Sequence, residues 1–292
     1  GFPQCSFLWR HQIDPLVQAG YTVAVPDQRG YGTSDAPIEV SEYMVRKLAG
    51  DVAGIAKELG FGEFIVIGQD WGAPVAWHTA LLHEDVCKAV MGMSVPYARL
   101  DDWDSWVNPP HADDGFWYIR YFQQKEIPEQ EIETDLRNGL LRLYSTLSGE
   151  APEGSWINQT RYPRDAKLSD ILLPANNDMK WLSDEELNYY VRFFETGGLR
   201  GPINWYRAMP LNGANTQELS TKKISQPAAF VAGAKDDVLK YAGSNNEFLK
   251  AMEAWCSDLR FKTLIPGAGH WLQCEQPEAT NKEILRFLEI VS

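Results

Sequence analysis

The chain has 292 residues, 44% of them hydrophobic and 12% aromatic, which is enough to bury the core of one large domain or of a domain with an insertion. The net charge of −13 argues against nucleic acid as a partner, because phosphate binding requires a basic face. No apolar run is long enough to span a bilayer and no signal peptide is visible, so we expect a cytoplasmic protein without a membrane partner.

Cysteine and histidine patterns exclude two further classes. The four cysteines contain no C-x-x-C pair and are too sparse for a disulfide scaffold, which is typical of reduced thiols in the cytosol. His78 and His83 are five residues apart and would point from diverging faces of a helix, so they do not form a metal-binding pair. The sequence predicts no metal site.

The expected elements indicate an α/β fold in three parts, 1–96, 97–215 and 216–292. In the first part we expect strands at 21–26, 64–68 and 87–95 and helices at 45–60 and 73–83. In the last part we expect strands at 227–233 and 261–265 and helices at 244–256 and 277–290. Such alternation is typical of βαβ units and a mostly parallel sheet flanked by helices.

The middle part, 97–215, differs in character. It is helical, aromatic and punctuated by proline, and it holds six of the eleven Trp residues. A helical block inserted into an α/β domain is typical of a lid over an active site. Because an open sheet normally buries strands that would precede Gly1, we also expect further N-terminal strands upstream of it.

Residues 64–77 carry the most informative pattern, Phe-Ile-Val-Ile-Gly-Gln-Asp-Trp-Gly-Ala-Pro-Val-Ala-Trp. A β-branched run ends at Gly68, reaches Asp70 and passes through Gly72 into a helix. This is the form of a nucleophile elbow, in which small residues allow close strand–helix contact and the central side chain projects above the sheet. The alternative is that Asp70 only caps the following helix.

An aspartate at this position selects the chemistry. Attack by its carboxylate on a saturated carbon gives an alkyl ester, which water can cleave at the carbonyl. A serine there would give an ether, which water does not cleave. The residue type therefore favours epoxides or alkyl halides as substrates.

Ester cleavage requires a base, and His270 is the candidate. It follows the strand at 261–265 on a glycine-containing loop, where the chain order nucleophile, acid, histidine would place it. An ordinary imidazole has a pKa of about 6.5 and is largely neutral at neutral pH. The alternative is a loop histidine without a role.

The orienting acid follows from elimination between two usual sites. Residues 94–96 contain no carboxylate, whereas Asp236 and Asp237 follow the strand at 227–233. We choose Asp236 and expect Asp237 to be its surface neighbour. For the oxyanion of ester cleavage, the backbone amides of Trp71 and Phe2 are the candidate donors.

These motifs together resemble those of the epoxide hydrolases with an α/β-hydrolase fold, from Gly1 to the last helix. The matching stretches are Gly1-Phe2-Pro3, Trp9-Arg10-His11-Gln12, Pro26-Asp27-Gln28-Arg29-Gly30-Tyr31-Gly32, Gly68 to Gly72 and Gly269-His270-Trp271. The resemblance implies two lid tyrosines that hydrogen-bond the epoxide oxygen, and these correspond to Tyr118 and Tyr206. A phenol with a pKa of about 10 is protonated at neutral pH and can donate. The alternative for lid aromatics is packing, and Tyr121 shares the helical face of Tyr118.

One departure and three alternatives complete the hypothesis. Gln69 stands before the nucleophile, where these enzymes commonly have His. A haloalkane dehalogenase would share the Asp nucleophile, a haloacid dehalogenase would need a cation where Trp71 stands, and a non-catalytic binding protein could share the fold. The resemblance implies a small-molecule epoxide as substrate and no cofactor, and it leaves a homodimer open.

Overall fold

The computed structural model describes residues 1–97, 103–240 and 245–292. Its centre is a sheet of four parallel strands in the order β1-β2-β3-β4. The strands are β1 (Phe64–Gln69), β2 (Cys87–Met93), β3 (Ile224–Gly233) and β4 (Cys256–Ile265). Parallel order places all their carboxyl ends at one edge of the sheet, which is where sites form in folds of this class.

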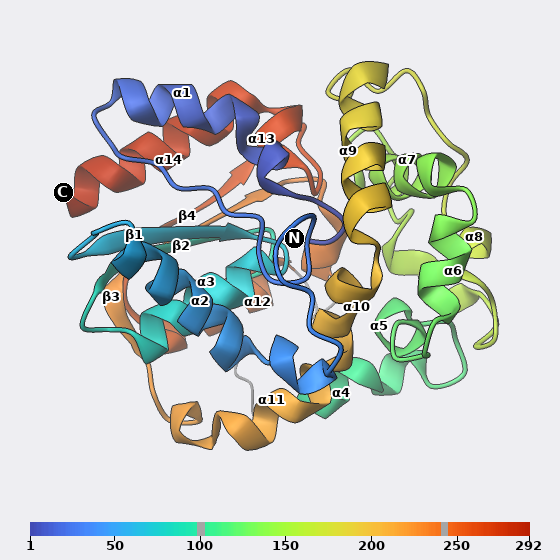
Figure 1. The fold of residues 1–292 in the computed structure, drawn as a ribbon, viewed down its shortest axis with the longest axis horizontal. Coiled ribbons are helices and arrows are strands. Elements are labelled where there is room, and N and C mark those ends of the chain that lie inside the picture. The colour runs from blue at the N-terminus through green and yellow to red at the C-terminus, as the bar shows by residue number, and fades with distance from the viewer. Residues whose placement is uncertain (98–102, 241–244) are drawn as a thin grey trace.

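Helices cover both faces of the sheet (Figure 1). The helices of the sheet domain are α1 (Arg10–Gln18), α2 (Val45–Glu58), α3 (Gly72–Leu82), α12 (Asn245–Trp255), α13 (Leu272–Glu275) and α14 (Pro277–Val291). In Figure 1, α1 and α14 lie above the sheet, whereas α2 and α3 lie below it. None of the helices among the described residues combines the length and apolarity needed to cross a membrane.

Strand β3 shows why its sequence is an almost continuous apolar run. Ala228, Phe230 and Ala232 pack with α3 and α12, and the intervening Ala229 and Val231 pack with α1 and α14. All five are fully buried. A parallel strand that is covered on both faces has no solvent side on which to place polar residues.

The chain between β2 and β3 folds into a second, helical layer, and we call its residues 103–215 the cap. Its helices are α4 (Trp103–Val107), α5 (Tyr118–Tyr121), α6 (Ile127–Glu133), α7 (Leu136–Leu147), α8 (Leu168–Ile171), α9 (Asp184–Gly197), α10 (Arg200–Arg207) and α11 (Met209–Asn215). The cap has no named strand and only one isolated bridge, between Gly115 and Pro163. In Figure 1, α5 to α9 gather beside the sheet and α10 runs along their inner side.

Short 3₁₀ helices connect these elements. They are η1 (Ser6–Trp9), η2 (Val40–Tyr43), η3 (Pro110–Ala112), η4 (Ile157–Arg161), η5 (Gln217–Leu219) and η6 (Asp237–Lys240). The largest apolar cluster of the protein spans the boundary between cap and sheet domain, because Phe2, Leu8 and Tyr31 join it together with residues of α7, α9 and α10. The cap is therefore held to the sheet domain by shared core.

The structure confirms most of the elements expected from sequence and corrects one. The strands expected at 64–68, 87–95, 227–233 and 261–265 are present, as are the helices expected on either side of them. The strand expected at 21–26 is wrong: the segment is irregular, and its side chains alternate between half-buried and exposed. A strand needs a hydrogen-bonded neighbour, and no described residue pairs with this segment. Helix α1 was not predicted, and Pro15 lies inside it.

The junction of β1 and α3 depends on Gly68, which has no side chain. A Cβ added to Gly68 would lie 1.9 Å from the carbonyl oxygen of Gly72 and 2.9 Å from the amide nitrogen of Ala73. Backbone atoms of this kind cannot move aside without separating the strand from the helix. Gly68 is therefore required by the close approach of the two elements.

Replacing Gly68 by Ala tests this contact. Since the clash is with backbone, we expect Gly68→Ala to lower the free energy of unfolding by about 3 kcal/mol or more, measured by urea denaturation. Gly54→Ala is the matched control, because Gly54 lies inside α2 and nothing lies within 4 Å of an added Cβ. That variant should gain about 0.5–1 kcal/mol from helix propensity. A Gly68→Ala protein as stable as the wild type would contradict the contact.

Candidate active site

Asp70 lies in the turn between β1 and α3, at the carboxyl edge of the sheet. Its backbone has a φ of 52°, in the left-handed region that Asp tolerates better than most residues. Its side chain is 14% exposed. Helix α3 has Trp71 as its N-cap residue and no side-chain cap. The carboxylate of Asp70 therefore does not cap helix α3.

Two backbone amides bind this carboxylate. The N–H of Phe2 donates to Oδ1 of Asp70 at 2.6 Å. The N–H of Trp71 also bonds the carboxylate and helps to lower its pKa. Gly1 allows this approach, because a Cβ there would lie 2.1 Å from both Cβ and Oδ1 of Asp70. The two amides named from sequence as oxyanion donors thus both reach Asp70.

The other oxygen faces His270. Nε2 of His270 lies 3.3 Å from Oδ2 of Asp70, and Nδ1 lies 2.9 Å from Oδ2 of Asp236. The side chains of His270 and Asp236 are 1% and 0% exposed. Oδ1 of Asp236 accepts from the N–H of Val238 at 2.9 Å, which fixes the carboxylate after β3. The structure therefore connects Asp70, His270 and Asp236 in one series of polar contacts, which we call the line of charges.

The charges of this line shift both pKa values. Burial lowers the pKa of His270, but the carboxylates of Asp236 and Asp70 outweigh it and raise the pKa to about 10. Burial raises the pKa of Asp70, but the opposing effects, chiefly the hydrogen bond and charge of His270, outweigh it and lower the pKa. An ordinary imidazole is largely neutral at neutral pH, whereas the charges of the two carboxylates favour the protonated form of His270 in the resting site.

Asp237 is separate from this line. Its Oδ2 accepts from the N–H of Trp156 at 3.0 Å, and its Oδ1 pairs with Nζ of Lys240 at 2.9 Å. The expectation that Asp237 is a surface residue is wrong, because it is only 8% exposed. Its contact with Trp156 in the cap is what buries it.

Two phenols of the cap lie near Asp70. Tyr118 begins α5 and Tyr206 lies in α10, and their rings are 5.9 Å apart at 78°. The ring of Tyr206 lies 5.2 Å from that of Trp71 and 5.6 Å from that of Phe2. Burial, and then the charge of Asp70, raises the pKa of both phenols above the ordinary value. Both therefore stay protonated at neutral pH and can donate.

Tyr121 shares the helix of Tyr118 but has a different partner. Its hydroxyl donates to the carboxylate of Glu131 in α6. Tyr118 instead packs against Trp156, with ring centroids 5.0 Å apart. Helical spacing alone does not distinguish the two tyrosines. Their hydrogen bonds do, because the hydroxyl of Tyr121 is bound to Glu131.

Two residues of the site received no role from sequence. Gln69 donates from Nε2 to the carbonyl of His270 at 2.9 Å and so ties β1 to the histidine loop. Tyr144 of α7 donates to the carbonyl of Pro3 at 2.7 Å and so holds the turn that carries the Phe2 amide. For Gln69 the signal was its place before Asp70. For Tyr144 a helical pattern alone contains no signal.

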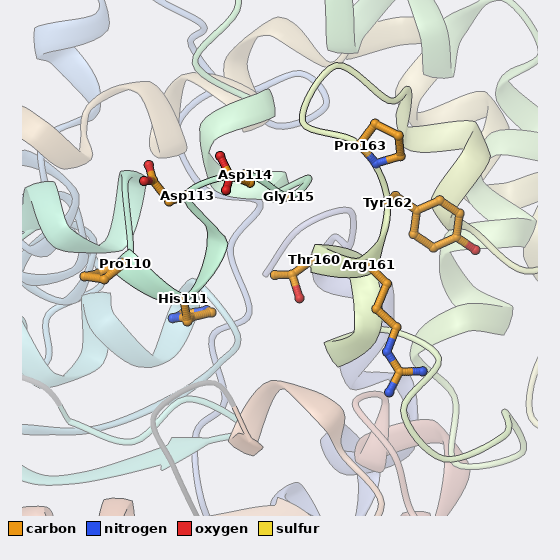
Figure 2. A pocket seen from close by; sticks show the side chains of 9 residues that line it. All are labelled: Pro110, His111, Asp113, Asp114, Gly115, Thr160, Arg161, Tyr162 and Pro163. Carbon is orange, nitrogen blue, oxygen red and sulfur yellow. The ribbon is translucent and has the colours of Figure 1, made fainter.

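A separate depression opens on the cap (Figure 2). It has a volume of about 450 Å³ and is lined by Pro110, His111, Asp113, Asp114, Gly115, Thr160, Arg161, Tyr162 and Pro163. None of these residues belongs to the line of charges or to the two phenols. Among the described residues there is also no group of three His, Cys, Asp or Glu side chains that could hold a metal ion.

Comparison with known proteins adds a family to this geometry. The family model described as "alpha/beta hydrolase fold" matches residues 1–277. Epoxide hydrolase A of Mycobacterium tuberculosis is 35% identical over 293 residues, covering 99% of this chain and 88% of that protein. Epoxide hydrolase B of the same organism is 33% identical over 323 residues, covering 99% and 89%.

Solved structures give the same result. An epoxide hydrolase from an endophytic Streptomyces superimposes with a TM-score of 0.92 at 33% identity, covering 99% of this chain and 87% of that one. Epoxide hydrolase A of Mycobacterium thermoresistibile gives a TM-score of 0.90 at 34% identity, covering 100% and 90%. At this identity the likeness extends beyond the fold.

The coupling between His270 and Asp70 can be measured directly. In Asp70→Asn one of the two carboxylates that raise the pKa of His270 is removed, so we expect that pKa to fall below its wild-type value of about 10. Titration of the imidazole by ¹⁵N NMR checks this. His78 is the internal control: burial lowers its pKa to about 4, and that value should not move. An unchanged His270 titration would contradict the coupling.

Proposed function

We propose that this chain, which belongs to the epoxide hydrolases of the α/β-hydrolase fold family, adds water to an oxirane and releases a vicinal diol. The observation that carries the proposal is the divided environment of Asp70. Its Oδ1 accepts from the Phe2 amide, its Oδ2 faces His270, and its charge acts on the neighbouring phenols of Tyr118 and Tyr206. This arrangement supplies a nucleophile, a base and acids for both halves of the reaction.

In the first half, Oδ2 of Asp70 attacks an epoxide carbon. The new bond is a carbon–oxygen ester bond, and the bond from that carbon to the ring oxygen breaks. The oxygen leaves as an alkoxide unless it receives a proton. Tyr118 or Tyr206 donates that proton while the other phenol hydrogen-bonds the oxygen. A departing halide would need no such donor, so the phenols favour an epoxide over an alkyl halide.

Ester formation changes the state of His270. The carboxylate of Asp70 becomes neutral, which removes one of the two charges that raise the pKa of the imidazole. The imidazolium can then return a proton to the phenolate left by the first half. The histidine becomes a neutral base only once there is an ester for water to attack.

In the second half, His270 takes a proton from water and hydroxide adds to the Cγ of Asp70. The oxyanion develops on Oδ1, which already accepts from the Phe2 amide, and the Trp71 amide also bonds this carboxylate. Collapse breaks the bond between Cγ and Oδ2, and the diol leaves with Oδ2 and the remaining carboxyl proton. The ionised Asp70 and the imidazolium are then restored, so the proton count closes.

An isotope experiment tests the covalent route. In a single turnover in H₂¹⁸O with enzyme in excess, the diol should carry only ¹⁶O, because its new oxygen is Oδ2 of Asp70. The ¹⁸O should appear in the Asp70 peptide, measured by mass spectrometry after digestion.

The control is a second turnover by the labelled enzyme, which should transfer ¹⁸O to some of the diol. A first diol that contains ¹⁸O, with no label in Asp70, would show direct attack by water on the epoxide.

The role of the phenols is tested by removing their hydroxyls. Because each can donate, Tyr118→Phe and Tyr206→Phe should each slow ester formation, and the double variant should slow it by about 10⁴-fold or more. Stopped-flow tryptophan fluorescence under single-turnover conditions measures this step.

Tyr121→Phe is the matched control, because its hydroxyl is bound to Glu131 and its loss should leave ester formation near the wild-type rate. A double Tyr118 and Tyr206 variant that opens epoxides at full rate would remove the phenols from the mechanism.

A further inference from the structure

Glu275 in α13 makes an unusual set of contacts next to the histidine loop. Its Oε1 accepts from the N–H of Trp271 at 3.0 Å, and its Oε2 accepts from the N–H of Gly269 at 3.0 Å. These two amides flank His270. Oε2 also accepts from the N–H of Gly149, in the cap, at 2.7 Å. One carboxylate therefore binds three backbone amides from two distant parts of the chain.

The same loop is joined to the end of α7 by further backbone contacts. The N–H of His270 donates to the carbonyl of Leu147 at 3.0 Å. Nε1 of Trp271 donates to the carbonyl of Tyr144 at 3.1 Å. The loop that carries His270 thus contacts the last turn of α7, and its position depends on these contacts.

Glycines bring the two backbones into contact. A Cβ on Gly269 would lie 2.2 Å from the amide nitrogen of Gly149, and one on Gly149 would lie 2.6 Å from that of Gly269. Two N–H donors that meet so closely cannot satisfy each other and need a common acceptor. Oε2 of Glu275 is that acceptor, and its negative charge strengthens both bonds.

The loop also has little stiffness of its own. Gly267 has a φ of 81°, and Gly269 carries no side chain, so both neighbours of Ala268 are conformationally permissive. Burial raises the pKa of Glu275 to about 7, and its three amide bonds act in the opposite direction. At mildly alkaline pH the residue is a carboxylate that can accept all three bonds.

We propose that Glu275 is a positioning residue for ester hydrolysis, which locks the His270 loop against Gly149 of the cap. The inference rests on the proposed function, because it assigns Glu275 to the half-reaction in which His270 acts as the base. Ester formation uses Asp70 and the cap phenols, so displacement of the loop should affect it much less. Loss of Glu275 should therefore slow ester hydrolysis much more than ester formation.

Glu275→Gln is the variant that tests this with little change in volume. A carboxamide has one acceptor oxygen, and its NH₂ group must face either Trp271 or the amide pair of Gly149 and Gly269. One or two of the three bonds are lost in either orientation. At mildly alkaline pH we expect ester hydrolysis to slow by about 100-fold while ester formation stays near the wild-type rate.

The measurement separates the two steps. Single-turnover stopped-flow fluorescence gives each rate with a styrene-type epoxide, and mass spectrometry of the enzyme during turnover should show the ester accumulating. His270→Gln serves as the reference for a trapped ester. Glu131→Gln is the matched control, because Glu131 accepts from the amides of Leu168 and Ser169 within the cap, and no ester should accumulate in that variant.

The outcomes distinguish the two proposals. A wild-type protein that opens no epoxide would overturn the proposed function itself. A wild type that turns over, with Glu275→Gln hydrolysing the ester at the wild-type rate, would overturn only the role of Glu275. Equal loss in both half-reactions would show a general structural defect and would also overturn it. Should Glu275→Gln not fold, Glu275→Asp keeps both oxygens on a shorter side chain and should show the same division.

Discussion

The unequal treatment of the two oxygens of Asp70 is the constraint on which the rest of the structure depends. Oδ1 accepts from the backbone N–H of Phe2, and Oδ2 is turned toward an imidazole. This division requires a left-handed backbone at Asp70 and the absence of side chains at Gly1 and Gly68. The sheet, the elbow and the N-terminal turn are all needed to present one carboxylate in this way.

The cap contributes more than cover, because its own hydrogen bonds hold the two phenols together. Nε2 of Gln123 donates to the carbonyl of Ile119 at 3.0 Å and to that of Tyr206 at 2.9 Å. It therefore joins α5, which carries Tyr118, to α10. The hydroxyl of Tyr144 then ties α7 to the turn of Phe2 and Pro3. The acids proposed for the first half-reaction and the oxyanion donors proposed for the second are thus held by one connected framework.

Much of the fold and of the candidate site could be predicted from the sequence, where the signal lies in neighbouring residues. Strands buried on both faces appear as apolar runs, and the elbow appears as small residues around Asp70. The features that the sequence did not predict depend on contacts between residues far apart in the chain. The segment at 21–26 has the composition of a strand but no pairing neighbour among the described residues. The burial of Asp237 comes from Trp156, and Gly149 and Glu275 are 126 residues apart. No local pattern contains such contacts.

The raised pKa of His270 explains how one histidine can serve a reaction of two halves. In the proposed mechanism the resting imidazolium offsets part of the charge of the two carboxylates, which keeps Asp70 ionised as the nucleophile. In the proposed mechanism, ester formation removes the charge of Asp70 and lowers the pKa of His270, so His270 becomes a base when the ester has formed. His270 must then be in position to take a proton from water. A catalytic loop anchored by backbone hydrogen bonds to both the sheet domain and the cap satisfies this requirement.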